Sequence, residues 1–177
     1  MKTIAICDTG FSSEILSLPN VIHYKDFGSL SKEHGTMIAR TIISICPKCK
    51  LILASMNVDS ICSAIDSLRW INLLHPDILN ISWVTKDKEE NIIKELKSIE
   101  NYGTKIFCAK NDMFKYPWIE FTGIDSKIEN DHYAGIPLRG SSVSCAIFSA
   151  KQALEEKNYN EFISVSSSIC GQVNLKI

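Results

Sequence analysis

Three polar side chains in this sequence have the chemistry of a nucleophilic triad. Asp8 ends an apolar run, His34 opens an apolar stripe with helical spacing, and Ser142 opens another such stripe late in the chain. A carboxylate can orient an imidazole, and the imidazole can then take the proton from a hydroxyl that becomes the nucleophile. A Ser at a helix N-terminus also lies where unpaired N–H groups and the helix dipole favour a developing negative charge. These three residue types therefore predict nucleophilic catalysis if the fold brings them together.

Apolar runs and helical stripes alternate along the chain in a way that could position these residues. Strands are predicted at residues 3–7, 21–25, 51–56, 77–82 and 104–109, with an edge or antiparallel strand at 118–124. Helices are predicted at 35–46, 59–74, 86–100 and 141–154, and the tail from 157 is ambiguous. This alternation indicates βαβ units, so we expect one α/β domain over 1–177 with a three-layer, doubly wound, mostly parallel sheet. Ligands of such sheets bind at the carboxyl ends of the strands.

Composition narrows the classes of partner. The chain has 177 residues, 45% hydrophobic and 22% charged, and its 19 Lys and Arg nearly balance its 20 Asp and Glu. A net charge of -1 gives no electrostatic footprint for nucleic acid or an acidic membrane surface. No segment reaches the roughly 18 apolar residues of a membrane span, and the first apolar run is too short for a signal peptide. We therefore expect a cytoplasmic protein with no nucleic-acid or membrane partner and no cofactor.

The cysteines have a structural interpretation and a chemical one. Seven is an odd number, and in the cytosol thiols stay mostly reduced. Cys46-Pro47-Lys48-Cys49 has metal-ligand spacing, but no second Cys pair has such spacing, so a helix-to-strand turn with two thiols is favoured over a metal site. Cys7 and Cys145 flank residues of the triad, where small buried hydrophobic residues are favoured over catalytic thiols.

Several motifs, in order, resemble those of the subtilisin-like serine proteases. They are Asp-Thr-Gly after a strand (8–10), His-Gly-Thr opening a helix (34–36) and Gly-Ser-Ser-Val-Ser opening a late helix (140–144). Between them, 76–82 resembles the family's segment ending in Val-Ile-Asn-Met-Ser-Leu-Gly, and 104–111 resembles its strand leading to an oxyanion-hole Asn. Each motif alone is weak, but their order along the chain is specific. The resemblance runs, with gaps, from about residue 3 to about residue 154, and it is to a short cytosolic form without a pro-segment.

The resemblance implies a role for each matching residue. Asp8 would orient His34, His34 would be the general base, and Ser142 would be the nucleophile. The Asn111 side-chain amide would donate to the oxyanion.

A substrate-binding edge is implied as well. Ser82, Trp83 and Val84 would form the edge that pairs with an extended peptide or protein substrate by β-augmentation. For the Trp83 side chain, a core position and a pocket-lining position are equally favoured.

The sequence also departs from the family pattern. Met37 replaces the family's second His, Lys110 replaces a Gly before the oxyanion Asn, and Val84 replaces a Gly on the substrate edge. The chain is short for the family, so a partner subunit or a second copy could complete the walls of its cleft. These features predict a serine endopeptidase of narrow specificity, such as one that removes the leader from a peptide precursor. One alternative is a weak or inactive subunit that binds extended peptide for a partner enzyme. Another is an unrelated α/β domain that binds a small ligand at the strand ends.

Overall fold

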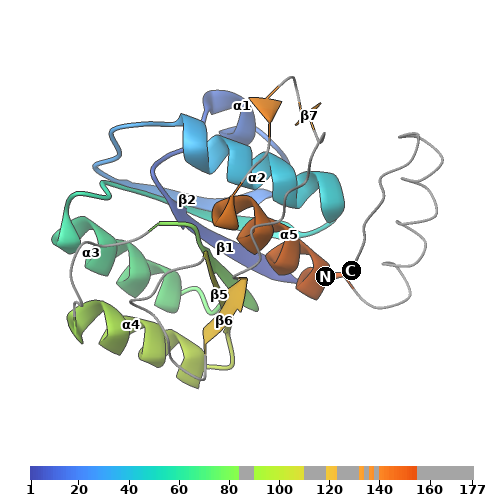
Figure 1. Ribbon diagram of the computed structural model, residues 1–177. Helices are drawn as coiled ribbons and strands as arrows, with labels where there is room; N and C mark the ends of the chain where they lie inside the picture. Colours follow the sequence, from blue (N-terminus) through green and yellow to red (C-terminus); the bar gives the residue numbers. More distant parts are fainter. Residues whose placement is uncertain (84–89, 110–118, 123–131, 134–135, 138–139, 155–177) are drawn as a thin grey trace.

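Parallel strands form the centre of the fold. The computed structural model describes residues 1–83, 90–109, 119–122, 132–133, 136–137 and 140–154 (Figure 1). Six parallel strands lie in the order β2-β3-β1-β4-β5-β6, and β7 pairs with β8 in a separate antiparallel ribbon. Their bounds are β1 Thr3–Asp8, β2 Val21–Phe27, β3 Lys50–Met56, β4 Ile78–Ile81, β5 Lys105–Ala109, β6 Ile119–Thr122, β7 His132–Tyr133 and β8 Ile136–Pro137.

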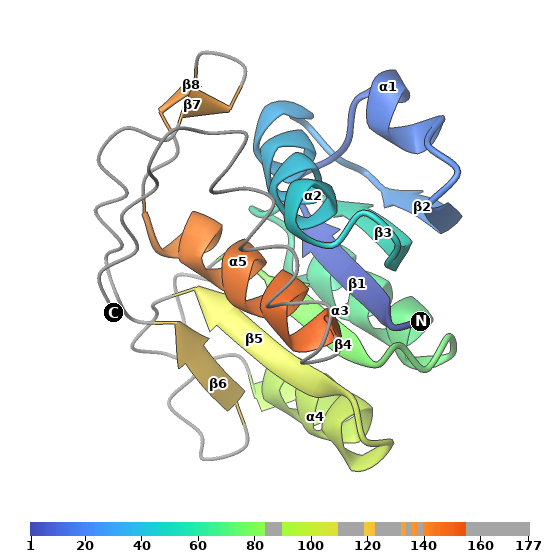
Figure 2. The ribbon, with the colours of Figure 1, turned by 90° about the vertical axis from the view of Figure 1, so that its right-hand side faces the viewer.

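Helices cover both faces of the six-stranded sheet, which confirms the predicted three-layer α/β fold (Figures 1 and 2). Their bounds are α1 Ser13–Leu16, α2 Glu33–Ile45, α3 Ile61–Asn72, α4 Glu90–Asn101 and α5 Ser141–Ala153. Because successive strand residues point to opposite faces, Ile4 and Ile6 of β1 pack under α1, α2 and α5. Ala5 and Cys7 pack under α3 and α4 on the other face. The central strand thus contributes to both cores.

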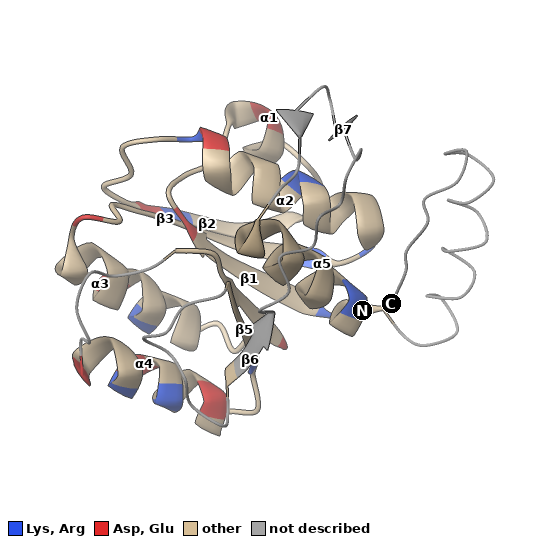
Figure 3. Cartoon of the chain, in the orientation of Figure 1, with Lys and Arg blue, Asp and Glu red and all other residues tan. Residues whose placement is uncertain are grey.

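The helices form where their apolar stripes predict them. In α3, Ala64, Leu68 and Ile71 are buried, and the Ser60 side chain caps the N-terminus by accepting a hydrogen bond from the Ser63 N–H. In α4 the buried residues are Ile92, Leu96 and Ile99. The outer face of α4 carries charges of both signs, as expected of a solvated face (Figure 3).

Three features differ from the sequence prediction or extend it. Strand β6 is a parallel edge strand, so of the two predicted alternatives the edge position is correct. The helix α1 was not predicted, because four residues are too few to show a periodic stripe; the Ser12 side chain caps it by accepting from the Ile15 N–H. Residues 86–89, where the helix observed as α4 was predicted to start, and the ambiguous tail from 157 lie outside the described residues. Within the described part of the chain, no helix is long and apolar enough to span a bilayer.

Candidate active site

Asp8 lies at the carboxyl end of β1, the strand held between β3 and β4 at the middle of the sheet. It is fully buried, and its Oδ1 accepts hydrogen bonds from the Thr9 N–H at 2.7 Å and from His34 Nδ1 at 2.8 Å. A carboxylate can only accept, so this contact places the His34 proton on Nδ1 and leaves Nε2 able to take a proton. Asp8 Oδ2 is also buried and has no hydrogen-bond partner among the described residues.

His34 is the second residue of α2, and about a third of its side chain is exposed. The hydrogen bond to Asp8 raises the pKa of the imidazole above its ordinary value, and the Asp8 charge adds to this effect, while partial burial of the ring opposes it. The buried carboxylate therefore stabilises the charged form that a general base acquires when it removes a proton.

Two glycines allow the loop after β1 to approach the start of α2. A Cβ on Gly35 would lie 2.3 Å from the Gly10 carbonyl oxygen and 3.2 Å from the Asp8 Cβ. Gly10 has a φ of +149°, and a Cβ there would lie 2.4 Å from the Ser31 carbonyl oxygen. Only residues without a side chain fit at such separations. The glycines of Asp-Thr-Gly and His-Gly-Thr thus bring Asp8 and His34 within hydrogen-bonding distance.

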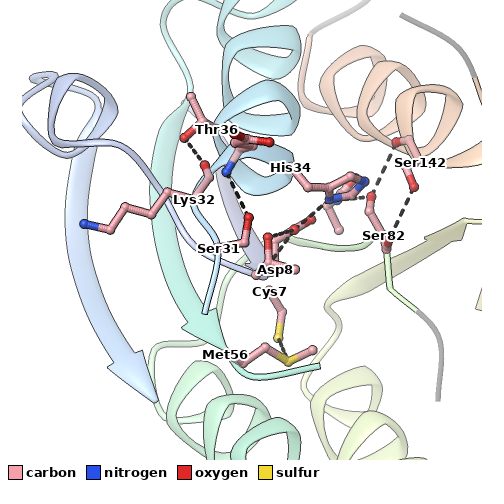
Figure 4. Close-up of polar contacts among 12 residues, drawn as sticks. Cys7, Asp8, Ser31, Lys32, His34, Thr36, Met56, Ser82 and Ser142 are labelled. Carbon is pink, nitrogen blue, oxygen red and sulfur yellow. Dashed lines mark hydrogen bonds and ion pairs between the residues drawn. The ribbon is translucent and has the colours of Figure 1, made fainter. Parts of the chain in front are cut away.

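Ser142 is the second residue of α5 and faces the segment that follows β4. Its Oγ donates to the Ser82 carbonyl oxygen at 3.2 Å, and Ser82 Oγ is 3.4 Å from the Ser142 carbonyl oxygen, to which it donates. The ring of His34 lies between Asp8 and this pair of serines (Figure 4). The fold therefore gathers the three predicted triad residues and Ser82 at one end of the sheet. The Ser142 hydroxyl donates to Ser82 rather than to His34.

The other predicted site residues are placed less completely. The Trp83 side chain is 5% exposed and belongs to the core between the sheet and α3 and α4, which favours the core alternative for this side chain. Val84 and Asn111 lie outside the described residues, as does Lys110.

A series of buried side-chain hydrogen bonds, which the sequence prediction did not assign, joins β4 to α5. The Asn80 side chain is fully buried; its Nδ2 donates to Ser82 Oγ at 3.0 Å, and its Oδ1 accepts from Ser149 Oγ at 3.0 Å. The signal in the sequence is an Asn inside an apolar strand and a Ser two helical turns after Ser142. These hydrogen bonds fix the position of Ser82, which is the hydrogen-bonding partner of Ser142.

The two cysteines beside the triad residues are buried, as the sequence prediction favoured. Burial raises the pKa of the Cys7 thiol to about 12, which leaves it protonated and unsuited to nucleophilic attack. Across the described ranges, no cluster of three or more His, Cys, Asp or Glu side chains could hold a metal ion.

Comparison with known proteins supports the fold. No protein-family model matches the sequence, and no curated protein matches it. The solved structure of the prenylagaramide maturation protease PagA is similar, with a TM-score of 0.65 and 14% identity, covering 97% of this chain and 78% of that one. A structure described as an S41 psychrophilic protease has a TM-score of 0.46 and 21% identity, covering 60% of this chain and 44% of that one. At 14% identity, the first match shows that this chain shares the fold of a maturation protease.

Proposed function

We propose that this protein is a serine peptidase whose nucleophile is Ser142. The observation that carries the proposal is the hydrogen bond between the buried Asp8 and His34, whose ring lies between Asp8 and Ser142 at the start of α5. Ser142 Oγ attacks a peptide carbonyl carbon while His34 Nε2 takes the hydroxyl proton, and the imidazole then gives that proton to the leaving amine. Water hydrolyses the acyl-enzyme by the reverse sequence. Asp8 keeps the Nδ1 proton in place and stabilises the imidazolium.

The oxyanion would form at the N-terminus of α5. The first N–H groups of a helix have no partner within it, and the N-cap residue of α5, Gly140, has no side chain that could cap them. The Asn111 amide is proposed as a further donor, from the resemblance to the subtilisin-like proteases. Removing one such donor costs about 3 kcal/mol of transition-state stabilisation.

The substrate is proposed to bind as an extended strand along the backbone of Ser82, Trp83 and Val84. Ser82 already contacts Ser142, so a strand paired there would present its carbonyl to the nucleophile. One further observation supports a narrow task such as leader removal from a peptide precursor: a protein with the same fold is named a maturation protease. A second copy or a partner subunit is proposed to complete the cleft.

A fluorophosphonate probe tests the proposal, because it labels only an activated serine. The wild type should be labelled, Ser142→Ala should not, and the matched control Ser141→Ala, one residue away in the same helical turn, should remain labelled. Circular dichroism establishes that each variant is folded. Labelling that persists in Ser142→Ala would refute the assignment of the nucleophile.

A second candidate is a catalytically weak subunit that captures extended peptide. The observation that favours it is the Ser142 hydroxyl, which donates to the Ser82 carbonyl and not to His34. A folded wild type that is not labelled but binds peptide would support this candidate. A folded protein that does neither would favour an α/β domain that binds a small ligand.

A further inference from the structure

The turn between α2 and β3 holds two thiols that the proposed peptidase chemistry does not use. Cys46 directly follows α2 and Cys49 directly precedes β3. Both are unbridged and buried, with exposures of 4% and 1%. Pro47 and Lys48 between them are exposed, so the turn itself is at the surface of the molecule.

A backbone hydrogen bond keeps the two cysteines of this turn close together. The Cys49 N–H donates to the Cys46 carbonyl oxygen at 3.1 Å, which closes a four-residue turn. Such a turn keeps its first and last Cα atoms within about 7 Å, and a disulfide requires about 4.4–6.8 Å. The Cα separation that this turn allows therefore overlaps the range that a disulfide requires.

A side chain from outside the turn holds it in this shape. The Asn20 amide donates to the Pro47 carbonyl oxygen at 2.7 Å and to the Cys49 carbonyl oxygen at 2.8 Å. Asn20 lies just before β2, the edge strand that pairs with β3. The turn is thus held both by its own backbone hydrogen bond and by the Asn20 side chain, which keeps Cys46 and Cys49 close together.

The two sulfurs are not equivalent. The neighbouring Cys49 lowers the pKa of the Cys46 thiol, against the opposing effect of burial. The neighbouring Cys46, together with burial, raises the pKa of the Cys49 thiol. The thiolate is the reactive form, so the lower pKa of Cys46 and its greater exposure, 4% against 1%, favour Cys46 as the attacking sulfur and Cys49 as the resolving one.

We propose that Cys46 and Cys49 are a redox-active dithiol that hydrogen peroxide, or a similarly small peroxide, oxidises to an intramolecular disulfide. The Cys46 thiolate attacks one peroxide oxygen and breaks the O–O bond, giving a sulfenic acid and a hydroxide that takes up a proton. The Cys49 sulfur then attacks the Cys46 sulfur and displaces the second oxygen as water. Two thiols lose two electrons, and one peroxide becomes two waters. A small oxidant fits because Cys46 is almost fully buried.

A metal site fits these residues less well than a disulfide. Two thiolates supply half of a tetrahedral ligand set. Within the part of the chain that the structure describes, no third or fourth ligand lies beside them.

The test is peptide mapping of the full chain after graded hydrogen peroxide, quenched with acid and alkylated with N-ethylmaleimide. The peptide containing residues 46–49 should lose both alkylations and two hydrogen atoms. Dimedone should trap a sulfenic acid at Cys46 in the Cys49→Ser variant. It should trap none at Cys49 in the Cys46→Ser variant. The control Cys62→Ser, which removes an exposed thiol, should leave the disulfide unchanged.

Two results would overturn the proposal. One is a wild type in which Cys46 and Cys49 stay alkylated while Cys62 is oxidised. The other is a wild type whose Cys46 and Cys49 bind added Zn²⁺ tightly and resist peroxide. The wild-type map decides the question even if a Ser variant fails to fold. None of these results depends on peptidase activity.

Discussion

At the residue scale, one contact gives the candidate site its chemistry. Asp8 is fully buried and Asp8 Oδ1 accepts from His34 Nδ1, so the imidazole has a set tautomer and a raised pKa. The raised pKa means that the folded state binds the imidazole proton more tightly than the unfolded chain does. The Asp8–His34 contribution to stability is therefore fully present below about pH 6.5, the ordinary imidazole pKa, and is lost as the pH rises through the higher pKa of the folded state.

Asp8→Asn should lower the pKa of His34 and shift the pH profile of probe labelling to lower pH. The amide carries no charge, so it no longer stabilises the imidazolium, and its NH₂ group can favour the wrong tautomer. We expect labelling of Ser142 to be slower by about 10⁴-fold, as for the same change in another triad. An NMR titration of His34 and labelling rates across pH measure both effects. An unchanged His34 pKa would contradict the assigned role of Asp8.

At the scale of elements, the site depends on close approach of the β1 loop to α2 and on the link between β4 and α5. Gly35 lets the start of α2 lie against the Gly10 carbonyl, and Asn80 joins Ser82 to Ser149. Neither Gly35 nor Asn80 takes part in the proposed reaction. Each sets which polar atoms meet at the carboxyl end of the sheet.

Gly35→Ala should destabilise the protein although Ala favours a helix over Gly by about 1 kcal/mol. The new Cβ would meet the Gly10 carbonyl oxygen at 2.3 Å, so the helix must shift, at a cost of about 1–3 kcal/mol. Labelling of Ser142 should fall with it. The control Gly28→Ala, at a φ of +93° with open space around it, should cost about 1 kcal/mol and leave labelling intact. Urea unfolding and probe labelling compare the two, and a stabilised Gly35→Ala would contradict this packing.

Ser149→Ala should destabilise the protein by about 1–3 kcal/mol, because it leaves the buried Asn80 Oδ1 without its donor. A double-mutant cycle with Asn80→Ala should show a coupling energy of at least about 0.5 kcal/mol, since the two side chains share one hydrogen bond. Denaturant unfolding of the four proteins gives this energy. Additive effects would show that the hydrogen bond does not link β4 to α5.

At the scale of the whole molecule, the two cores share one sheet. Alternate residues of β1 enter the core under α2 and the core under α3, so loss of either helical layer would expose the central strand. We therefore expect the described part of the fold to unfold as one unit.

Leu68→Ala tests whether the fold unfolds as one unit, by a change on the face of the sheet opposite α2 and His34. Leu68 is fully buried in α3, and its truncation should lower the free energy of unfolding by about 2–5 kcal/mol. Unfolding followed by tryptophan fluorescence and by far-ultraviolet circular dichroism should give coincident transitions in the variant and the wild type. Two separated transitions would show that the α3–α4 layer unfolds independently.

Much of the element order could be predicted from the sequence. Alternation of apolar runs and helical stripes predicts the strands, the helices and the three layers, because side-chain periodicity depends on local backbone geometry. The same reasoning selected Asp8, His34 and Ser142, which lie at element ends. It missed α1 and the role of Asn80, since a four-residue helix has no period and a lone polar residue does not name its partner.

Contacts between elements were decided by the tertiary structure alone. Periodicity shows which face of an element is apolar, but not which atoms of other elements meet it. The strand order, the Ser82 partner of Ser142 and the core position of Trp83 all arise from packing between segments distant in the chain. The turn of Cys46 and Cys49 shows the same division. Its spacing is evident in the sequence, whereas its backbone hydrogen bond and its contacts with the Asn20 side chain depend on how α2, β2 and β3 pack.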